Sequence, residues 1–193
     1  GGMGAYSQAP VQTPALHARA MREVIQPVVA GMEAMGEPYT GFLYAGLMIT
    51  PEQQLKVLEF NCRLGDPETQ PMMVRLKSDL VDLLEHGVNG TLDRAEAEWD
   101  RRAALGIVLA AAGYPEDPRA GDVIEGLDEA AATGAEVYHA GTLPGPGGTV
   151  VTAGGRVLAV SARGDSVADA RTRAYAAAEL VRFDGRQMRG DIA

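Results

Sequence analysis

The sequence predicts an α+β fold in which antiparallel strands are accompanied by amphipathic helices. Two observations carry this prediction. Strand-like segments occur as neighbours joined by short polar turns, and the helical segments beside them begin at recognisable capping residues. The chain has 193 residues, 46% of them hydrophobic, which is enough for a sizeable core in one large or two small domains.

The first helix is expected over residues 13–36, with Thr13 as its cap and Pro14 at its first position. Gly36 is a natural stop. Pro27 should kink or interrupt this helix, because it has no backbone N–H to donate.

An antiparallel hairpin is expected next, from a strand over residues 39–50, a turn at 51–54 and a strand over 55–63. A second helix should follow over residues 66–87, capped by Asp66 and ended by Gly87. Its predicted apolar face consists of Met73, Leu76, Leu80, Leu83 and Leu84.

The chain turns polar and acidic over residues 88–100, and we expect a domain boundary there, giving domains at residues 1–95 and 96–193. The second half should be α+β as well. It offers apolar strands at 102–113 and 135–143, a hairpin over 148–164 with a tight turn at Gly154-Gly155, and a closing helix that begins at Ser166.

The net charge of -9 and the pI near 4.8 argue against a nucleic-acid surface, which needs clustered Lys and Arg. Small anionic ligands stay possible. Cys62 is the only cysteine, so no intrachain disulfide forms, which fits a reducing cytosol. No apolar run is long enough to span a membrane, and we expect a cytoplasmic protein.

Residues 59–68, with the sequence EFNCRLGDPE, form the candidate site. Side chains of a strand alternate, so Glu59, Asn61 and Arg63 should share one face, about 7 Å apart in succession. Leu58, Phe60 and Cys62 should point to the core. A carboxylate and an amide oxygen suit Mg²⁺, and the guanidinium suits a phosphoryl oxygen. A polar strand face with Glu59 paired to Arg63 is the alternative.

Several motifs in one order resemble the glycinamide ribonucleotide synthetase (phosphoribosylamine–glycine ligase) family of the ATP-grasp superfamily. The pattern R-L-G-D-P-E at residues 63–68 is similar to that family's signature, and GGMGAYSQ at the start is similar to its glycine loop, with Gln8 where proline is usual. Further similar segments are YTGFLYAGLM, PMMVRLKSDLVDLL, GDVIEGL, HAGT and VTAGGRVLAVSARGD.

The resemblance implies the C-terminal portion of an ATP-grasp domain, an antiparallel sheet with helices, followed by a small α+β C-terminal domain. It also implies ATP-dependent ligation of glycine to 5-phosphoribosylamine through a glycyl phosphate, with ATP as co-substrate. Glu59 and Asn61 match the family's Mg²⁺ or Mn²⁺ ligands, and Arg63 matches a catalytic position at the transferring phosphate.

The roles of the remaining motif residues stay open. The amides of the opening glycines suit an anion, and the signature's two carboxylates suit substrate or phosphate contacts, although the first carboxylate equally suits a helix cap. These substrate- or phosphate-binding candidates are Gly1, Gly2, Gly4, Asp66 and Glu68. Arg156 and Arg163 suit either a substrate contact or a solvated hairpin.

The family's enzymes are much longer, so we expect this chain to be a C-terminal fragment that is inactive alone and has the enzyme's N-terminal part as its partner. Its other expected partners are the small molecules glycine, 5-phosphoribosylamine and ATP, with no nucleic acid and no membrane. Two alternatives remain, another ATP-grasp carboxylate–amine ligase and a non-catalytic packing module.

Overall fold

The computed structural model describes residues 2–193, which form two compact units interleaved along the sequence. The first unit contains residues 2–8, 66–77 and 99–193, and the second contains residues 9–65 and 78–98. Both units combine helices with antiparallel strand pairs, so the predicted α+β class is confirmed.

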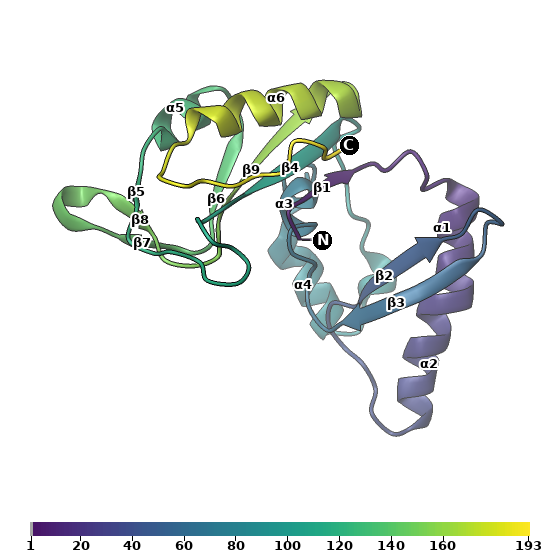
Figure 1. The fold of residues 1–193 in the computed structure, drawn as a ribbon. Helices are drawn as coiled ribbons and strands as arrows, with labels where there is room; N and C mark the ends of the chain where they lie inside the picture. Colours follow the sequence, from purple (N-terminus) through teal and green to yellow (C-terminus); the bar gives the residue numbers. More distant parts are fainter. Residues whose placement is uncertain (1) are drawn as a thin grey trace. The chain divides into compact units, whose positions relative to one another are not determined.

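A four-stranded antiparallel sheet in the order β1-β4-β9-β6 organises the first unit (Figure 1). Its strands are β1 (Gly4–Ser7), β4 (Ala103–Ala110), β9 (Arg156–Gly164) and β6 (Glu136–His139). The predicted apolar strand at 102–113 is therefore confirmed as β4. Every residue of β4 is buried, which explains why its sequence is apolar throughout rather than alternating.

Helices cover both faces of this sheet. On one face, the paired residues Ile107 and Val160 belong to a core cluster that includes the alanine face of α6 (Val167–Leu180). On the other face, the paired residues Gly106 and Ser161 lie beside Pro71 of α3 (Thr69–Met73). Ser166 caps α6 as predicted, with its hydroxyl accepting from the Asp169 amide over 3.1 Å.

A smaller three-stranded sheet has the order β5-β8-β7, from β5 (Val123–Ile124), β8 (Val150–Thr152) and β7 (Thr142–Pro144). The short helices α5 (Leu127–Ala132) and η3 (Pro146–Gly148) lie between these strands along the chain.

The predicted hairpin over residues 148–164 is wrong. Strand β8 pairs with β5 and β7, whereas β9 pairs with β4 and β6. The chain passes from one sheet to the other between these strands, where the Ala153 amide donates to the Gly141 carbonyl and the Gly141 amide donates to the Arg156 carbonyl. The predicted strand at 135–143 divides at the same place into β6 and β7.

The second unit begins with the predicted helix, which Thr13 caps by accepting from the Leu16 amide over 3.2 Å. Its segments are α1 (Pro14–Ala20), the π-helical turn η1 (Met21–Ile25) and α2 (Gln26–Ala34). The π-turn ends two residues before Pro27, so the predicted interruption is confirmed.

The predicted hairpin of this unit is also confirmed, as β2 (Tyr44–Ile49) paired antiparallel with β3 (Leu55–Asn61). The remaining elements are α4 (Leu80–Val88) and η2 (Leu92–Arg94). Within the described chain, no helix is both long and apolar enough to cross a membrane.

The predicted single helix over residues 66–87 is wrong, because the segment contains α3 and α4 in different units. Leu76 forms an isolated bridge with Trp99, so the backbone there is not helical. Asp79 begins α4 anew, accepting from the Val81 amide over 2.8 Å, and Gly87 lies inside that helix. Asp66 does not cap α3, whose capping position is Glu68.

Candidate functional site

Strand β3 carries Glu59 and Asn61, and Arg63 follows two residues after its end. Glu59 is paired with Gly46 and Asn61 with Tyr44 of the neighbouring strand. The register shifts between Gly46 and Leu47, so that Leu58 has no partner on β2. This bulge interrupts the strict alternation that the sequence predicts.

The three polar side chains form a chain of hydrogen bonds along the strand. The Asn61 amide donates to Glu59 Oε1 over 3.2 Å, and Arg63 Nη2 donates to Asn61 Oδ1 over a long 3.5 Å. Arg63 Nη1 also donates to the Leu64 carbonyl over 2.9 Å. The structure thus brings all three predicted residues together, with Asn61 between the carboxylate and the guanidinium.

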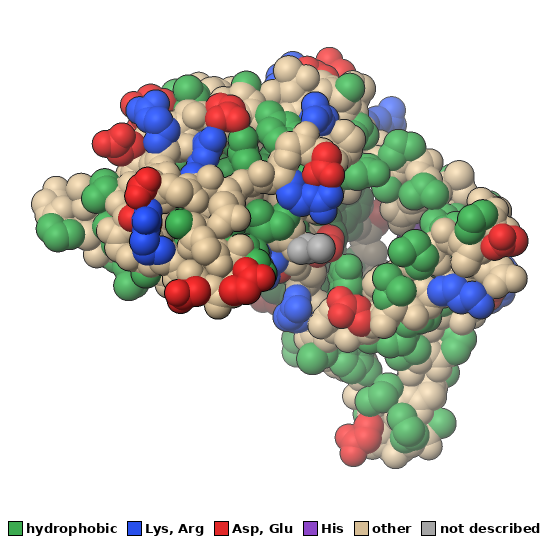
Figure 2. Space-filling view, in the orientation of Figure 1, with side chains coloured by type: hydrophobic (Ala, Val, Ile, Leu, Met, Phe, Trp, Pro, Cys, Tyr) green, Lys and Arg blue, Asp and Glu red, His purple; other side chains and the backbone are tan. Residues whose placement is uncertain are grey.

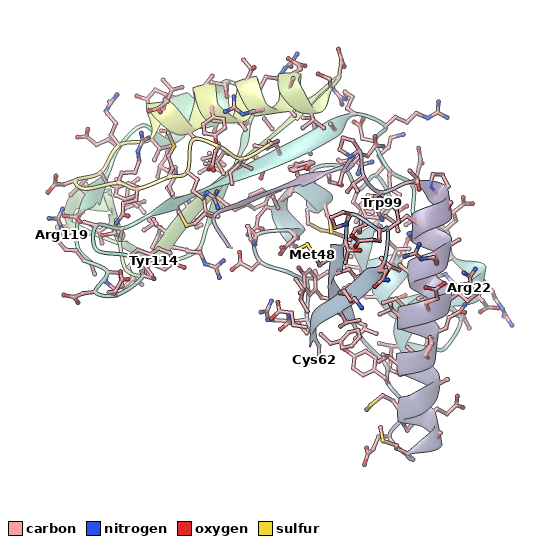
Figure 3. The ribbon with its side chains drawn as sticks, turned by 45° about the vertical axis from the view of Figure 1, so that its right-hand side comes forward. Arg22, Met48, Cys62, Trp99, Tyr114 and Arg119 are labelled. Carbon is pink, nitrogen blue, oxygen red and sulfur yellow. The ribbon has the colours of Figure 1, made fainter. Side chains whose placement is uncertain are left out.

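The prediction that Leu58, Phe60 and Cys62 belong in the core is wrong. Leu58 is 64% exposed and Phe60 is 40% exposed, and the thiol of Cys62 is also exposed near the end of the hairpin (Figure 3). All residues from Lys56 to Phe60 reach solvent, so neither face of β3 is covered in the described second unit.

The donor set of this strand fits a hard divalent cation. Glu59 supplies a carboxylate and Asn61 an amide oxygen, and Mg²⁺ in nucleotide sites takes one or two protein oxygens with phosphate and water supplying the rest. A cage made by protein alone is not found: within residues 2–193, no three His, Cys, Asp or Glu side chains are grouped to hold a metal.

Asp66 of the signature lies in the first unit, where Arg156 binds it. Arg156 Nη2 lies 3.0 Å from Asp66 Oδ2, and Nη1 donates to the Asp66 carbonyl over 3.1 Å. The same Nη1 donates to the Gly2 carbonyl over 3.1 Å. Asp66 is thus the partner of an arginine instead of a helix cap.

The segment that resembles a glycine loop is already a β-strand from Gly4 onward. Gly1 lies outside the described residues. Gly4 begins β1 and is paired with Ile107 of β4, and the carbonyl of Met3 accepts from the Val108 amide over 3.0 Å. Gly2, with a φ of +82°, is the glycine that stands before this strand.

A buried arginine in the first unit was not predicted from the sequence. Arg75 is 8% exposed and donates to the carbonyls of Asp100 and Arg102 and to the hydroxyl of Ser7. Burial lowers the pKa of its guanidinium, and the nearby Asp100 charge opposes that shift. The signal available in the sequence was an arginine placed within the apolar run PMMVRL at residues 71–76.

Asp100 is held in its charged form by the arginines around it. The side chain and backbone of Arg102 donate to its carboxylate, and Arg163 Nη1 lies 3.3 Å from Asp100 Oδ2. The hydrogen bonds from Arg102 and the positive charges of both arginines keep the pKa of Asp100 far below its usual range.

A cavity of about 190 Å³ lies at the C-terminal half of α4 in the second unit. His86 lines it and bonds through Nδ1 to the Thr91 hydroxyl over 2.8 Å, which agrees with a packing role for this histidine. None of the predicted site residues lines this cavity. The complete lining is Asp82, Glu85, His86, Asn89 and Thr91.

Two family models match the chain in order along its length. The ATP-grasp (A) domain of phosphoribosylglycinamide synthetase matches residues 1–69, and the C domain of the same enzyme matches residues 104–193. Together the two models cover most of the chain, including Glu59, Asn61 and Arg63 in the first match and Arg156 in the second.

Curated relatives and a solved structure agree with these matches. The phosphoribosylamine–glycine ligase of Xanthomonas campestris pv. campestris is 58% identical over 192 residues, and that of Neisseria meningitidis serogroup A is 58% identical over 193 residues. These alignments cover 100% of this chain but 44% and 45% of the relatives.

The crystal structure of phosphoribosylamine–glycine ligase from Thermotoga maritima superposes with a TM-score of 0.83 at 35% identity, covering 99% of this chain and 46% of that one. The chain therefore spans a little under half the length of the relatives it matches. It belongs to the phosphoribosylglycinamide synthetase family, also named phosphoribosylamine–glycine ligase.

Proposed function

We propose that this chain forms part of an enzyme that ligates glycine to 5-phosphoribosylamine with ATP, a step of purine biosynthesis. The products are glycinamide ribonucleotide, ADP and phosphate. The observation that carries the proposal is the hydrogen-bonded series of Glu59 and Asn61 on β3 and Arg63 just after its end, which leads into the signature turn of a family to which the chain belongs.

The reaction proceeds in two displacements. A carboxylate oxygen of glycine attacks the γ-phosphorus of ATP, the bond to the β–γ bridging oxygen breaks, and ADP leaves. The amine of 5-phosphoribosylamine then attacks the carbonyl carbon of the resulting glycyl phosphate, phosphate leaves with the former carboxylate oxygen, and the amine loses a proton to solvent. Both steps concentrate negative charge, so positioning and electrostatic stabilisation dominate catalysis.

The residues at the end of β3 and just beyond it have different roles in this reaction. Glu59 and Asn61 would hold Mg²⁺ or Mn²⁺, and the cation would neutralise phosphate charge when bound. Arg63 is the catalytic residue, because its planar guanidinium can donate two parallel hydrogen bonds to the transferring phosphoryl group. The amides of Gly2 and Gly4 and the carboxylate of Glu68 remain proposed contacts for substrate or phosphate.

The proposal includes the arrangement of the whole enzyme. Residues 1–95 belong to the ATP-grasp domain and residues 96–193 to the C-terminal domain. The portion of the relatives that this chain does not cover supplies the rest of the nucleotide site, so the 193-residue chain alone has little or no activity. A cytoplasmic location accords with the single cysteine and with purine synthesis.

The test is a chimera in which this chain replaces the matching 192 residues of the Xanthomonas campestris relative. ADP release is followed by a coupled assay with glycine, 5-phosphoribosylamine and ATP. The proposal predicts turnover that needs both glycine and the amine. Turnover with a different carboxylate or amine in place of these two would support another ATP-grasp ligase instead.

A further inference from the structure

Arg156 is a residue whose contacts the proposed reaction does not use. It begins β9, directly after the passage between the two sheets of the first unit, and its side chain is 30% exposed. The six residues that follow it on β9, 157–162, are all buried, so its backbone is fixed by the core.

Its guanidinium joins two segments that are far apart in sequence. Nη1 donates to the carbonyls of Gly2 and Asp66, each over 3.1 Å, while Nη2 lies 3.0 Å from the Asp66 carboxylate. Binding the carbonyl and the carboxylate of one residue fixes both the backbone and the side chain of Asp66. The planar fork of arginine suits such a combined contact, whereas the point charge of lysine does not.

The conformation of Gly2 fits the same arrangement. Its φ of +82° is one that residues with a side chain rarely adopt, and a Cβ atom added there would lie 3.0 Å from Arg156 Nη1. A glycine at this position therefore lets the guanidinium approach the backbone before β1.

We propose that Arg156 is a positioning residue of the ligase, which holds the opening glycine segment and the signature turn together by binding Gly2 and Asp66. We call this set of contacts of Arg156 with Gly2 and Asp66 the clamp. In it, Asp66 accepts the hydrogen bonds of Arg156 and does not touch substrate. The inference rests on the proposed function for its catalytic consequence, since Asp66 follows the catalytic Arg63 by three residues.

The catalytic test is a double-mutant cycle in the chimera, with Arg156→Ala, Asp66→Ala and both changes together. Each single change should lower kcat by about tenfold, because loss of one charge-assisted contact of this kind corresponds to about one decade. The double variant should lose no more than either single variant, since both remove the same clamp. Arg156→Lys should fall between wild type and Arg156→Ala.

Arg182→Ala is the matched control. Arg182 lies in the same unit, its guanidinium is 3.9 Å from Glu125, and both side chains are about two-thirds exposed. This variant should retain wild-type kcat. The clamp would be overturned if the losses of kcat in the two single variants multiplied in the double variant. It would also be overturned if the KM for one substrate rose only with Arg156→Ala. Either result would make Arg156 or Asp66 a substrate contact.

A second measurement separates the clamp from the ligase activity. Hydrogen–deuterium exchange of the 193-residue chain should be faster in Arg156→Ala than in wild type for peptides covering residues 2–8 and 64–72, and unchanged in Arg182→Ala. Unchanged exchange in both segments would overturn the clamp. An inactive wild-type chimera would instead count against the proposed function, and the exchange result would still decide the role of Arg156.

Discussion

The side-chain amide of Asn61 donates a hydrogen bond to Glu59 Oε1 over 3.2 Å, which holds the two proposed metal ligands side by side on β3. A carboxylate with two oxygens can accept this bond and still coordinate a cation. The hydrogen bond and a metal contact are therefore compatible at Glu59, which leads to the first prediction.

Glu59→Gln should weaken metal activation of the chimera, because the amide keeps the shape of the side chain but removes its charge. We expect the Mg²⁺ concentration for half-maximal ADP release to rise by at least about tenfold. Glu33→Gln on α2 is the control, since Glu33 is an exposed glutamate of the same unit. The assays are titrated with MgCl₂ at fixed ATP. If the Mg²⁺ concentration for half-maximal ADP release rises equally in both variants, the effect comes from net charge.

Arg63→Lys should lower kcat by at least about tenfold, since a lysine keeps the charge and loses the bidentate fork. The free energy of unfolding should change by no more than about 0.5 kcal/mol, because Arg63 is exposed. Arg22→Lys, at another exposed arginine of the second unit, provides the comparison. Steady-state kinetics measure kcat, and urea titration measures the free energy of unfolding. A kcat equal to that of Arg22→Lys would show that Arg63 does not act in the catalytic step.

Arg75→Met should destabilise the protein by about 3 kcal/mol, because buried carbonyls lose their charged donor. Methionine fills a comparable volume, so the change reports mainly on hydrogen bonding. Urea unfolding followed by circular dichroism measures the loss, with Arg182→Met as the exposed control. A change below about 0.5 kcal/mol, the range typical of surface sites, would mean that the hydrogen bonds of Arg75 do not stabilise the first unit.

Acid should remove the contribution of Asp100 to stability. The pKa of Asp100 is lowered in the folded state by Arg102 first and then by Arg163, so the stabilisation is complete above the unfolded value of about 4. It is lost as the pH falls from there toward the folded pKa. The difference in urea midpoint between wild type and Asp100→Asn should therefore shrink from pH 6 to pH 3.

The exposed Asp117→Asn serves as the control for this titration. Its urea midpoint should lie close to that of wild type, as is typical of substitutions at exposed sites. A difference between wild type and Asp100→Asn that stays constant between pH 6 and pH 3 would show that Asp100 acts through shape and not through its charge.

Local features of the fold could be predicted from the sequence. The capping of α1 by Thr13, the interruption at Pro27 and the start of α6 at Ser166 depend on residues only a few positions apart. The same holds for the β2–β3 hairpin, whose strands are separated by one short turn. In each case, the interaction that fixes the structure lies within the segment itself.

Long-range pairing explains the errors. A short connection joins β8 to β9, but β8 pairs with β5 and β7, whereas β9 pairs with β6 and with β4, whose residues lie about 50 positions earlier in the chain. The segment 66–87 reads as one helix until the bridge between Leu76 and Trp99 is known. No pattern within the segment shows that Asp66 would be bound by Arg156, 90 residues away.

The apolar residues of the second unit show the same limit. Met48, Leu58 and Phe60 have the alternating character of a core strand, yet they are exposed in the described unit, where apolar side chains are visible at the surface (Figure 2). The sequence indicates that such side chains prefer burial. It does not say which part of the protein, within the chain or outside it, covers them.

The most direct test of the account is the transfer of oxygen from glycine. The chimera is supplied with glycine labelled with ¹⁸O in its carboxylate, and the released phosphate is analysed by mass spectrometry. The account predicts one ¹⁸O atom in each phosphate, because the attacking carboxylate oxygen leaves with the phosphoryl group. Ligation that proceeds with unlabelled phosphate would contradict the glycyl phosphate, and with it the role proposed for Glu59, Asn61 and Arg63.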